Sequence, residues 1–148
     1  MNSLPNESLA PAPSESRPSL LHRDVTHVIL GAFYAVHSEL GFGFLEAVYK
    51  NALVVMLRNA KVHVDREVPY DILFHGESIG LYRADTIVES KVVVEVKTGL
   101  AIDPAHCAQL RNYLRASDLE VGLLLNFGHS AEFKRMISNR RTRSSPHG

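Results

Sequence analysis

Two stretches early in the chain carry hydrophobic residues at helical spacing. Apolar positions recur at intervals of three and four over residues 24–40, and again over residues 45–59. This spacing places the apolar side chains on one face of a helix. The segment Gly41-Phe42-Gly43 interrupts the pattern between them. We therefore predict two consecutive amphipathic helices joined by a short glycine-containing loop.

The middle of the chain has the composition of strands. We predict one strand in two parts within residues 62–74, with Pro69 requiring an edge position or a strand end. A turn at 75–78 precedes a second strand over 79–88, and a hairpin turn leads into a third over 91–97. These three strands follow one another closely enough to form an antiparallel meander.

A helix and a strand follow, and then a short final element. Asp103-Pro104 is typical of a helix start, with aspartate as the N-cap, and this helix is expected to end near Ser117. Residues 119–126 form a continuous apolar run suited to a strand buried on both faces, and a short helix is predicted over 130–138. The order α-α-β-β-β-α-β-α predicts an α/β fold with helices on both faces of a central mixed sheet.

Composition narrows the class of protein. The formal net charge is zero, so attraction to nucleic acid must come from local patches, such as the basic residues between Lys134 and Arg143. That cluster fits a solvated terminus as well as a phosphate-contacting arm. Cys107 is the single cysteine, which excludes an intramolecular disulfide. We expect no membrane span and no secretory signal, and hence a cytoplasmic protein.

Two predicted strands bring acids and a lysine together. Glu95 and Lys97 are two residues apart, so they share one strand face while Val94 and Val96 take the other. Burying such charges is costly without a partner or a metal. Asp85 supplies a second acid if its strand pairs with this one. The pattern indicates a divalent-metal site with a lysine beside it.

The motifs around these residues resemble a known family. The order of elements, with an aspartate on one strand and Glu-x-Lys on the next, resembles the PD-(D/E)XK nuclease superfamily and its restriction-endonuclease-like core. Ala84 stands where the superfamily's name has proline. The segment 43–49 is similar to the motif of one branch, the GxxExxY proteins. The quoted motifs are Gly43-Phe44-Leu45-Glu46-Ala47-Val48-Tyr49, Arg83-Ala84-Asp85, Glu95-Val96-Lys97 and Gln109-Leu110-Arg111-Asn112-Tyr113.

The resemblance implies a chemistry for the first group of residues. Asp85, Glu95 and the Val96 carbonyl would hold Mg²⁺ or Mn²⁺, cations that favour hard oxygen ligands. Lys97 would hold the attacking water and stabilise developing negative charge. Whether Lys97 also acts as the base depends on its pKa, which the sequence leaves open.

Five further residues have a less specific signal. By resemblance, Glu46 is a further metal ligand, and the alternative is a first-turn carboxylate favoured by the helix dipole. By resemblance, Gln109 and Tyr113, four apart on one helical face, would flank the site and contact the lysine or a phosphate. The alternative is that Tyr113 packs in the core and Gln109 forms hydrogen bonds with the backbone. Arg83 could reach a phosphate or one of the acids. His106, on the same helix, is the one histidine worth testing as a ligand.

The implied activity is a metal-dependent nuclease that hydrolyses phosphodiester bonds, with DNA favoured over RNA. The alternative is a non-catalytic module on the same fold that binds nucleic acid or protein. A homodimer would supply two sites for cutting two strands, although no residue demonstrates one. We expect three regions: a disordered tail over 1–22, a nuclease-like domain over 23–139 and a basic flexible tail over 140–148.

Overall fold

The protein is described here by a computed structural model covering residues 22–138. Apart from residue 22, the two predicted tails lie outside the described residues. The elements in chain order are α1 (Arg23–Leu40), α2 (Glu46–Asn59), β1 (Val64–Phe74), β2 (Glu77–Val88), β3 (Val92–Lys97), α3 (Pro104–Ser117), β4 (Val121–Phe127) and β5 (Ala131–Ile137).

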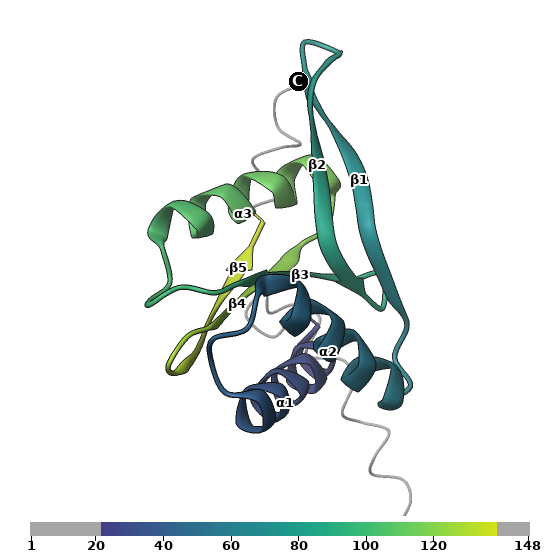
Figure 1. The fold of residues 1–148 in the computed structure, drawn as a ribbon. Coiled ribbons are helices and arrows are strands. Elements are labelled where there is room, and N and C mark those ends of the chain that lie inside the picture. The colour runs from purple at the N-terminus through teal and green to yellow at the C-terminus, as the bar shows by residue number, and fades with distance from the viewer. Residues whose placement is uncertain (1–21, 139–148) are drawn as a thin grey trace, which may run out of the picture.

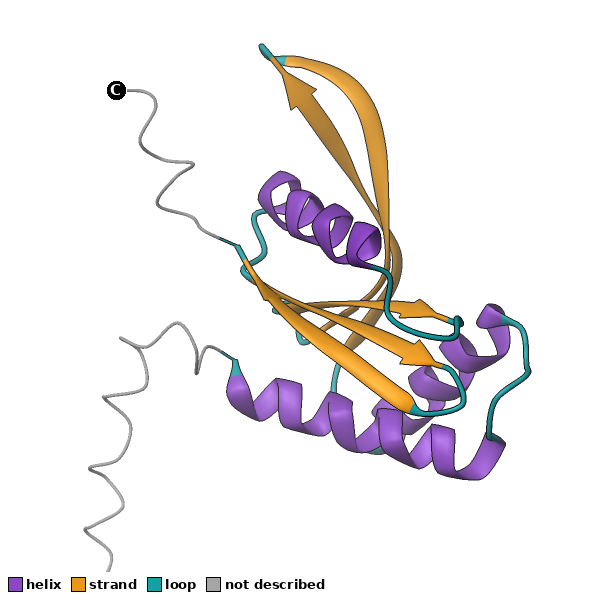
Figure 2. Cartoon of the chain, turned by 90° about the vertical axis from the view of Figure 1, so that its left-hand side faces the viewer, coloured by secondary structure: helices purple, strands orange, loops and turns teal. Residues whose placement is uncertain are grey.

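The strands form a single mixed sheet in the order β1-β2-β3-β4-β5. Neighbouring strands are antiparallel except for β3 and β4, which run parallel because α3 carries the chain across between them. Helices α1 and α2 cover one face, and α3 lies on the other (Figures 1 and 2). The predicted mixed sheet with helices on both faces is therefore confirmed.

Two hydrophobic layers hold the sheet between its helices. The layer under α1 and α2 contains Phe33, Leu53 and the inward-facing Val94 and Val96 of β3. The layer under α3 contains Val93, together with side chains of α3 and β4. All seven residues of β4 are buried, as expected for an apolar strand between two neighbours in a sheet with helices on both faces.

Helix α3 begins as the sequence predicts. The side chain of Asp103, the N-cap residue, accepts a hydrogen bond of 2.9 Å from the Ala105 amide, and Pro104 occupies the first helical turn. This cap satisfies a backbone donor that has no partner within the helix. The helix end at Ser117 also agrees with the prediction.

Strands β1 and β2 form a long hairpin whose tip extends away from the rest of the sheet (Figure 1). β1 is an edge strand, which explains how Pro69 is accommodated within it, because an edge strand needs no hydrogen bond from every amide. β2 pairs with β3 only through Thr86, Ile87 and Val88. The hairpin therefore separates from the central sheet just beyond Thr86.

The predicted helix over 130–138 is wrong, because this segment is strand β5. Its seven residues are too few for a helix without strong tertiary support, whereas β4 offers a full row of backbone partners. The exposed Glu132 and Lys134 alternate with half-buried Ala131 and Phe133, which is a period of two. A Cβ at Gly128 would lie 2.5 Å from the Gly99 carbonyl oxygen, so the turn into β5 requires glycine.

Candidate functional site

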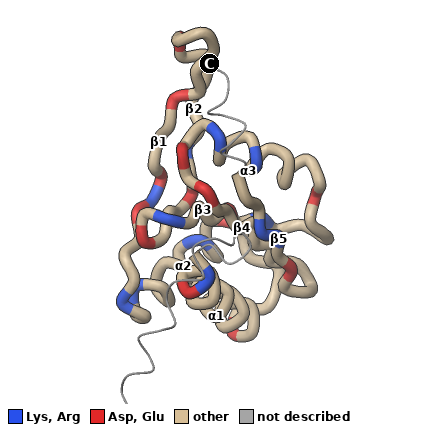
Figure 3. Tube along the Cα trace, turned by 180° about the vertical axis from the view of Figure 1, so that it is seen from behind, with Lys and Arg blue, Asp and Glu red and all other residues tan. Residues whose placement is uncertain are grey.

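The site lies where β2 leaves β3. Thr86 pairs with Val94 in the last register pair of these strands, so Asp85 and Glu95 follow at the point of divergence. Beyond this last pair, the backbone amides of Asp85 and Val96 have no partner in regular β2–β3 pairing, and they need other partners. Acidic positions of β2 and β3 gather at the centre of the fold, between α2 and α3 (Figure 3).

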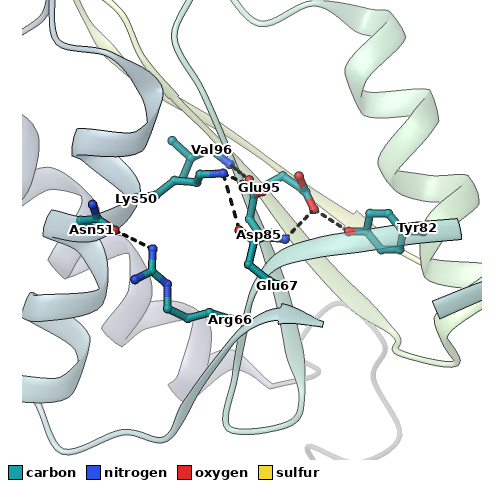
Figure 4. Close-up of polar contacts among 8 residues, drawn as sticks. All are labelled: Lys50, Asn51, Arg66, Glu67, Tyr82, Asp85, Glu95 and Val96. Atoms are coloured by element: carbon teal, nitrogen blue, oxygen red, sulfur yellow. Dashed lines mark hydrogen bonds and ion pairs between the residues drawn. The ribbon is translucent and has the colours of Figure 1, made fainter. Parts of the chain in front are cut away.

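The two carboxylates supply those partners. The Asp85 amide donates to Glu95 Oε2 at 3.3 Å, and the Val96 amide donates to Asp85 Oδ2 at 3.2 Å (Figure 4). Each acid thus bonds to the backbone of the opposite strand. The exchange fixes both side chains at one edge of the sheet, as the sequence pattern predicts.

Tyr82 adds a second bond to the glutamate. Its hydroxyl donates to Glu95 Oε2 at 2.5 Å. The Tyr82 ring stacks on Tyr113 of α3, with ring centroids 3.9 Å apart, and on Tyr70 of β1 at 6.2 Å. Burial, followed by the charge of Glu95, raises the pKa of Tyr82, so this residue stays a hydrogen-bond donor. Both of these bonds to Glu95 fall on Oε2.

Two acids close together change each other's titration. Burial and then the charge of Asp85 raise the pKa of Glu95 to about 7, although the Tyr82 hydrogen bond acts in the opposite direction. Like charges that share a site disfavour full ionisation unless a cation is present. A cation that binds beside this pair of carboxylates would therefore be stabilised by them.

A lysine from α2 already provides such a charge. Lys50 Nζ lies 3.1 Å from Asp85 Oδ1 and 4.0 Å from Glu67 Oε2. Burial alone lowers the pKa of Lys50, but the hydrogen bond and charge of Asp85, with smaller effects of Glu67 and Glu46, raise it overall. Lys50 is therefore a cation at this site.

Lys97 and Val96 complete the β3 segment. Lys97 is half-buried and has the same strand parity as Glu95, whereas the Val96 side chain is buried in the layer under α1 and α2. The burial of Val94 and Val96 in that one layer agrees with the predicted facing of β3. Two carboxylates and a nearby backbone carbonyl form a set of hard oxygens, which fits Mg²⁺ or Mn²⁺ by ligand chemistry.

Glu46 is the first residue of α2, half-buried and one turn from Lys50. Within residues 22–138, no three histidine, cysteine, aspartate or glutamate side chains are grouped closely enough to hold a metal ion. Glu46 is thus not grouped with Asp85 and Glu95. Its negative charge instead acts on Lys50, because it helps to raise the pKa of that lysine.

Tyr49 explains the tyrosine of the 43–49 motif. Its hydroxyl donates to the Gly41 carbonyl at 2.6 Å and accepts from the Phe44 amide at 3.3 Å. Its fully buried ring stacks on Phe127 at 4.3 Å. Tyr49 therefore fixes the loop that leads into α2, and with it the start of the helix that carries Glu46 and Lys50.

The remaining predicted residues differ in their contacts and in their exposure to solvent. Tyr113 reaches it through its stacking on Tyr82, whereas Gln109 is exposed, which corrects its placement on the buried stripe of α3. Arg83 is exposed on β2, two residues before Asp85, and His106 is half-buried on α3. Their roles stay predictions.

Lys50 and Tyr82 are two site residues to which the sequence analysis gave no role. The position of Lys50, four residues after Glu46, would have signalled a shared helix face. Tyr82 gave no comparable signal. It reaches Glu95 diagonally across the strands, and the twist of β2 that permits this is not visible in the sequence.

Comparisons with known proteins found one family model and a similar solved structure. The family model described as the PD-(D/E)XK nuclease superfamily matches residues 23–136. The solved structure titled "Crystal structure of SSO0001" is similar at a TM-score of 0.50 and 21% identity, over 85% of this chain. This chain spans 64% of the length of that protein. No curated protein matches. None of the helices described in 22–138 is long and apolar enough to span a membrane.

Proposed function

Since this chain belongs to the PD-(D/E)XK nuclease superfamily, we propose that it is a divalent-metal-dependent nuclease that hydrolyses phosphodiester bonds in DNA. The observation that supports this most is the reciprocal bonding of Asp85 and Glu95 at the divergence of β2 and β3. A half-buried lysine of the same strand parity as Glu95 follows two residues later. We also propose that the chain belongs to the GxxExxY branch, on the motif at 43–49.

Each residue has a part in the proposed reaction. Asp85, Glu95 and the Val96 carbonyl would hold Mg²⁺ or Mn²⁺. When bound, the cation would neutralise phosphate charge and lower the pKa of a bound water. Lys97 would orient that water and stabilise negative charge on the phosphate as it develops. Tyr82 would hold the Glu95 carboxylate in place through its hydrogen bond to Oε2.

The residues around this centre would serve the substrate. Arg83 is exposed on the strand that carries Asp85, so its guanidinium is available to a phosphate of the backbone. Tyr113 would support Tyr82 through ring stacking. Gln109 is exposed on α3 one turn before Tyr113 and would contact the substrate from that side. Glu46 would tune the charge of Lys50 and would not ligate the cation directly.

Cleavage of defined substrates tests the proposal. Purified protein is incubated with single- and double-stranded DNA and with RNA of the same sequence, with Mn²⁺, with Mg²⁺ or with chelator. We expect metal-dependent cleavage of DNA that falls by at least about a hundredfold in Asp85→Asn and Glu95→Gln. Lys91→Met, an exposed lysine at the turn before β3, is the matched control. Equal cleavage by wild type and Asp85→Asn would assign the activity to a contaminant or to another site.

A further inference from the structure

The Lys50–Asp85 ion pair uses one particular oxygen of the carboxylate. Asp85 Oδ2 accepts from the Val96 amide, a bond that is part of the strand arrangement. Asp85 Oδ1 accepts from Lys50 Nζ at the end of a flexible side chain. The side chains of Lys50 and Asp85 are only 20% and 15% exposed, so solvent screens their charges little. Of the two bonds, the one to Oδ1 can be broken without disturbing the sheet.

Glu67 offers Lys50 a second partner. Arg66 pairs with Thr86 and Val68 with Ala84, so Glu67 lies opposite Asp85 across the hairpin. Its side chain is 52% exposed and its carboxylate forms a long ion pair of 4.0 Å with the lysine. A shift of the Lys50 ammonium from Asp85 toward Glu67 would shorten this ion pair.

The backbone at Glu67 is arranged in an unusual way. Its φ of 51° lies in the left-handed region, which a glutamate in a strand rarely adopts. The preceding residue is held to α2, since Arg66 Nη2 donates to Asn51 Oδ1 at 2.6 Å (Figure 4). Asn51 directly follows Lys50 and Arg66 directly precedes Glu67, so this one hydrogen bond links the backbone segments that carry Lys50 and Glu67. Strained backbone of this kind concentrates at functional sites.

We propose that Lys50 is an exchangeable counter-ion of the site, which neutralises Asp85 before metal binding and moves to Glu67 when a divalent cation takes Asp85 Oδ1. This inference rests on the proposed function, because it requires a cation at Asp85. In the metal-free protein, the ammonium offsets part of the negative charge that Asp85 and Glu95 bring together. It also competes with the metal, and Glu67 offsets that competition by accepting the displaced charge.

Calorimetric titration of the full chain with Mn²⁺ alone tests the exchange. Lys50→Met removes the charge and keeps most of the side-chain length. We expect it to bind Mn²⁺ more tightly than wild type by up to about fivefold, the ratio that corresponds to about 1 kcal/mol for a partly exposed ion pair. Lys91→Met controls for the loss of one positive charge elsewhere and should bind as wild type does. Unchanged or weaker binding by Lys50→Met, relative to Lys91→Met, would overturn the proposal.

Glu67→Gln tests the second half of the exchange. We expect it to weaken Mn²⁺ binding in wild type, because the displaced ammonium loses its partner, and to have no effect in the Lys50→Met background. An equal effect in both backgrounds would show that Glu67 acts independently of Lys50 and would overturn the exchange.

Thermal unfolding gives a readout that requires no activity. Without metal, Lys50→Met should melt below wild type, because Asp85 loses its counter-ion, and saturating Mn²⁺ should raise its melting temperature by more than that of wild type. Equal melting temperatures without metal would contradict the counter-ion role. If neither wild type nor Lys50→Met binds Mn²⁺, the proposed function fails as well. If wild type binds Mn²⁺ and Lys50→Met binds it no better, only the exchange fails.

Discussion

Asp85 and Glu95 are joined through the backbone of each other's strands. The Asp85 amide donates to Glu95, and the amide that follows Glu95 donates to Asp85. The two acids therefore stabilise the contact between β2 and β3 at the same point where they are proposed to bind a cation. Changes to either acid will affect the fold as well as the chemistry. The amides Asp85→Asn and Glu95→Gln are better probes than alanine, because they keep an oxygen that can accept the backbone bond.

Tyr82→Phe should shift the pH dependence of metal binding. The substitution removes the 2.5 Å hydrogen bond to Glu95 and keeps the ring stacked on Tyr113. Because that bond lowers the pKa of Glu95, its loss should raise this pKa further, by up to about one unit for a hydrogen bond to a charged group. Mn²⁺ titrations at several pH values should show the binding midpoint at higher pH. Tyr70→Phe is the control, and a matching shift in that variant would contradict the assignment.

The stability of the metal-free protein should fall as pH rises. The folded-state pKa of Glu95 is raised from 4.5 to about 7, so the folded state holds this proton more tightly than the unfolded state. The resulting stability is fully present below about pH 4.5 and is lost as pH rises through about 7. The loss is at most about 3 kcal/mol.

Urea unfolding in the presence of chelator measures this effect. Glu95→Gln resembles the protonated glutamate and has no titration at this position. As the pH rises from about 4.5 to above about 7, the free energy of unfolding of wild type should therefore fall relative to that of Glu95→Gln. A difference between the two proteins that does not change with pH would contradict the raised pKa.

Much of this arrangement was predictable, and the failures have physical causes. The parity of Glu95 and Lys97, and the cap at Asp103, follow from local periodicity and local hydrogen bonding, which the sequence encodes directly. The contact of Tyr82 with Glu95 depends on how two strands twist apart. The strand β5 depends on a partner edge offered by β4, and the period of two over its first four residues is too short a signal to identify a strand by itself.

Tyr49→Phe should destabilise the loop before α2. The change removes the bonds to the Gly41 carbonyl and the Phe44 amide and keeps the stacking on Phe127. Loss of buried hydrogen bonds of this kind costs about 1–3 kcal/mol in the free energy of unfolding. Chemical denaturation measures it directly. Tyr34→Phe, at a tyrosine that is 46% exposed, is the control and should change stability little. Equal stability of the two variants would show that the motif tyrosine does not hold the loop.

Lys97→Met should separate binding from chemistry. The lysine is proposed to act on the attacking water and not to ligate the cation. We expect DNA cleavage to fall by about a hundredfold or more, as for removal of a donor that stabilises developing charge. Mn²⁺ binding should be retained or slightly strengthened. If Lys97→Met lost metal binding and cleavage in parallel, its role would be in the structure of the site.

The most direct measurement is the anomalous scattering of a crystal grown with Mn²⁺ and collected near the manganese absorption edge. The account predicts a single strong peak bonded to carboxylate oxygens of both Asp85 and Glu95, with the Lys50 ammonium moved away from Asp85. The peak should be absent in Asp85→Asn. A peak bound elsewhere, or no peak at Mn²⁺ concentrations that support cleavage, would contradict the proposed metal site.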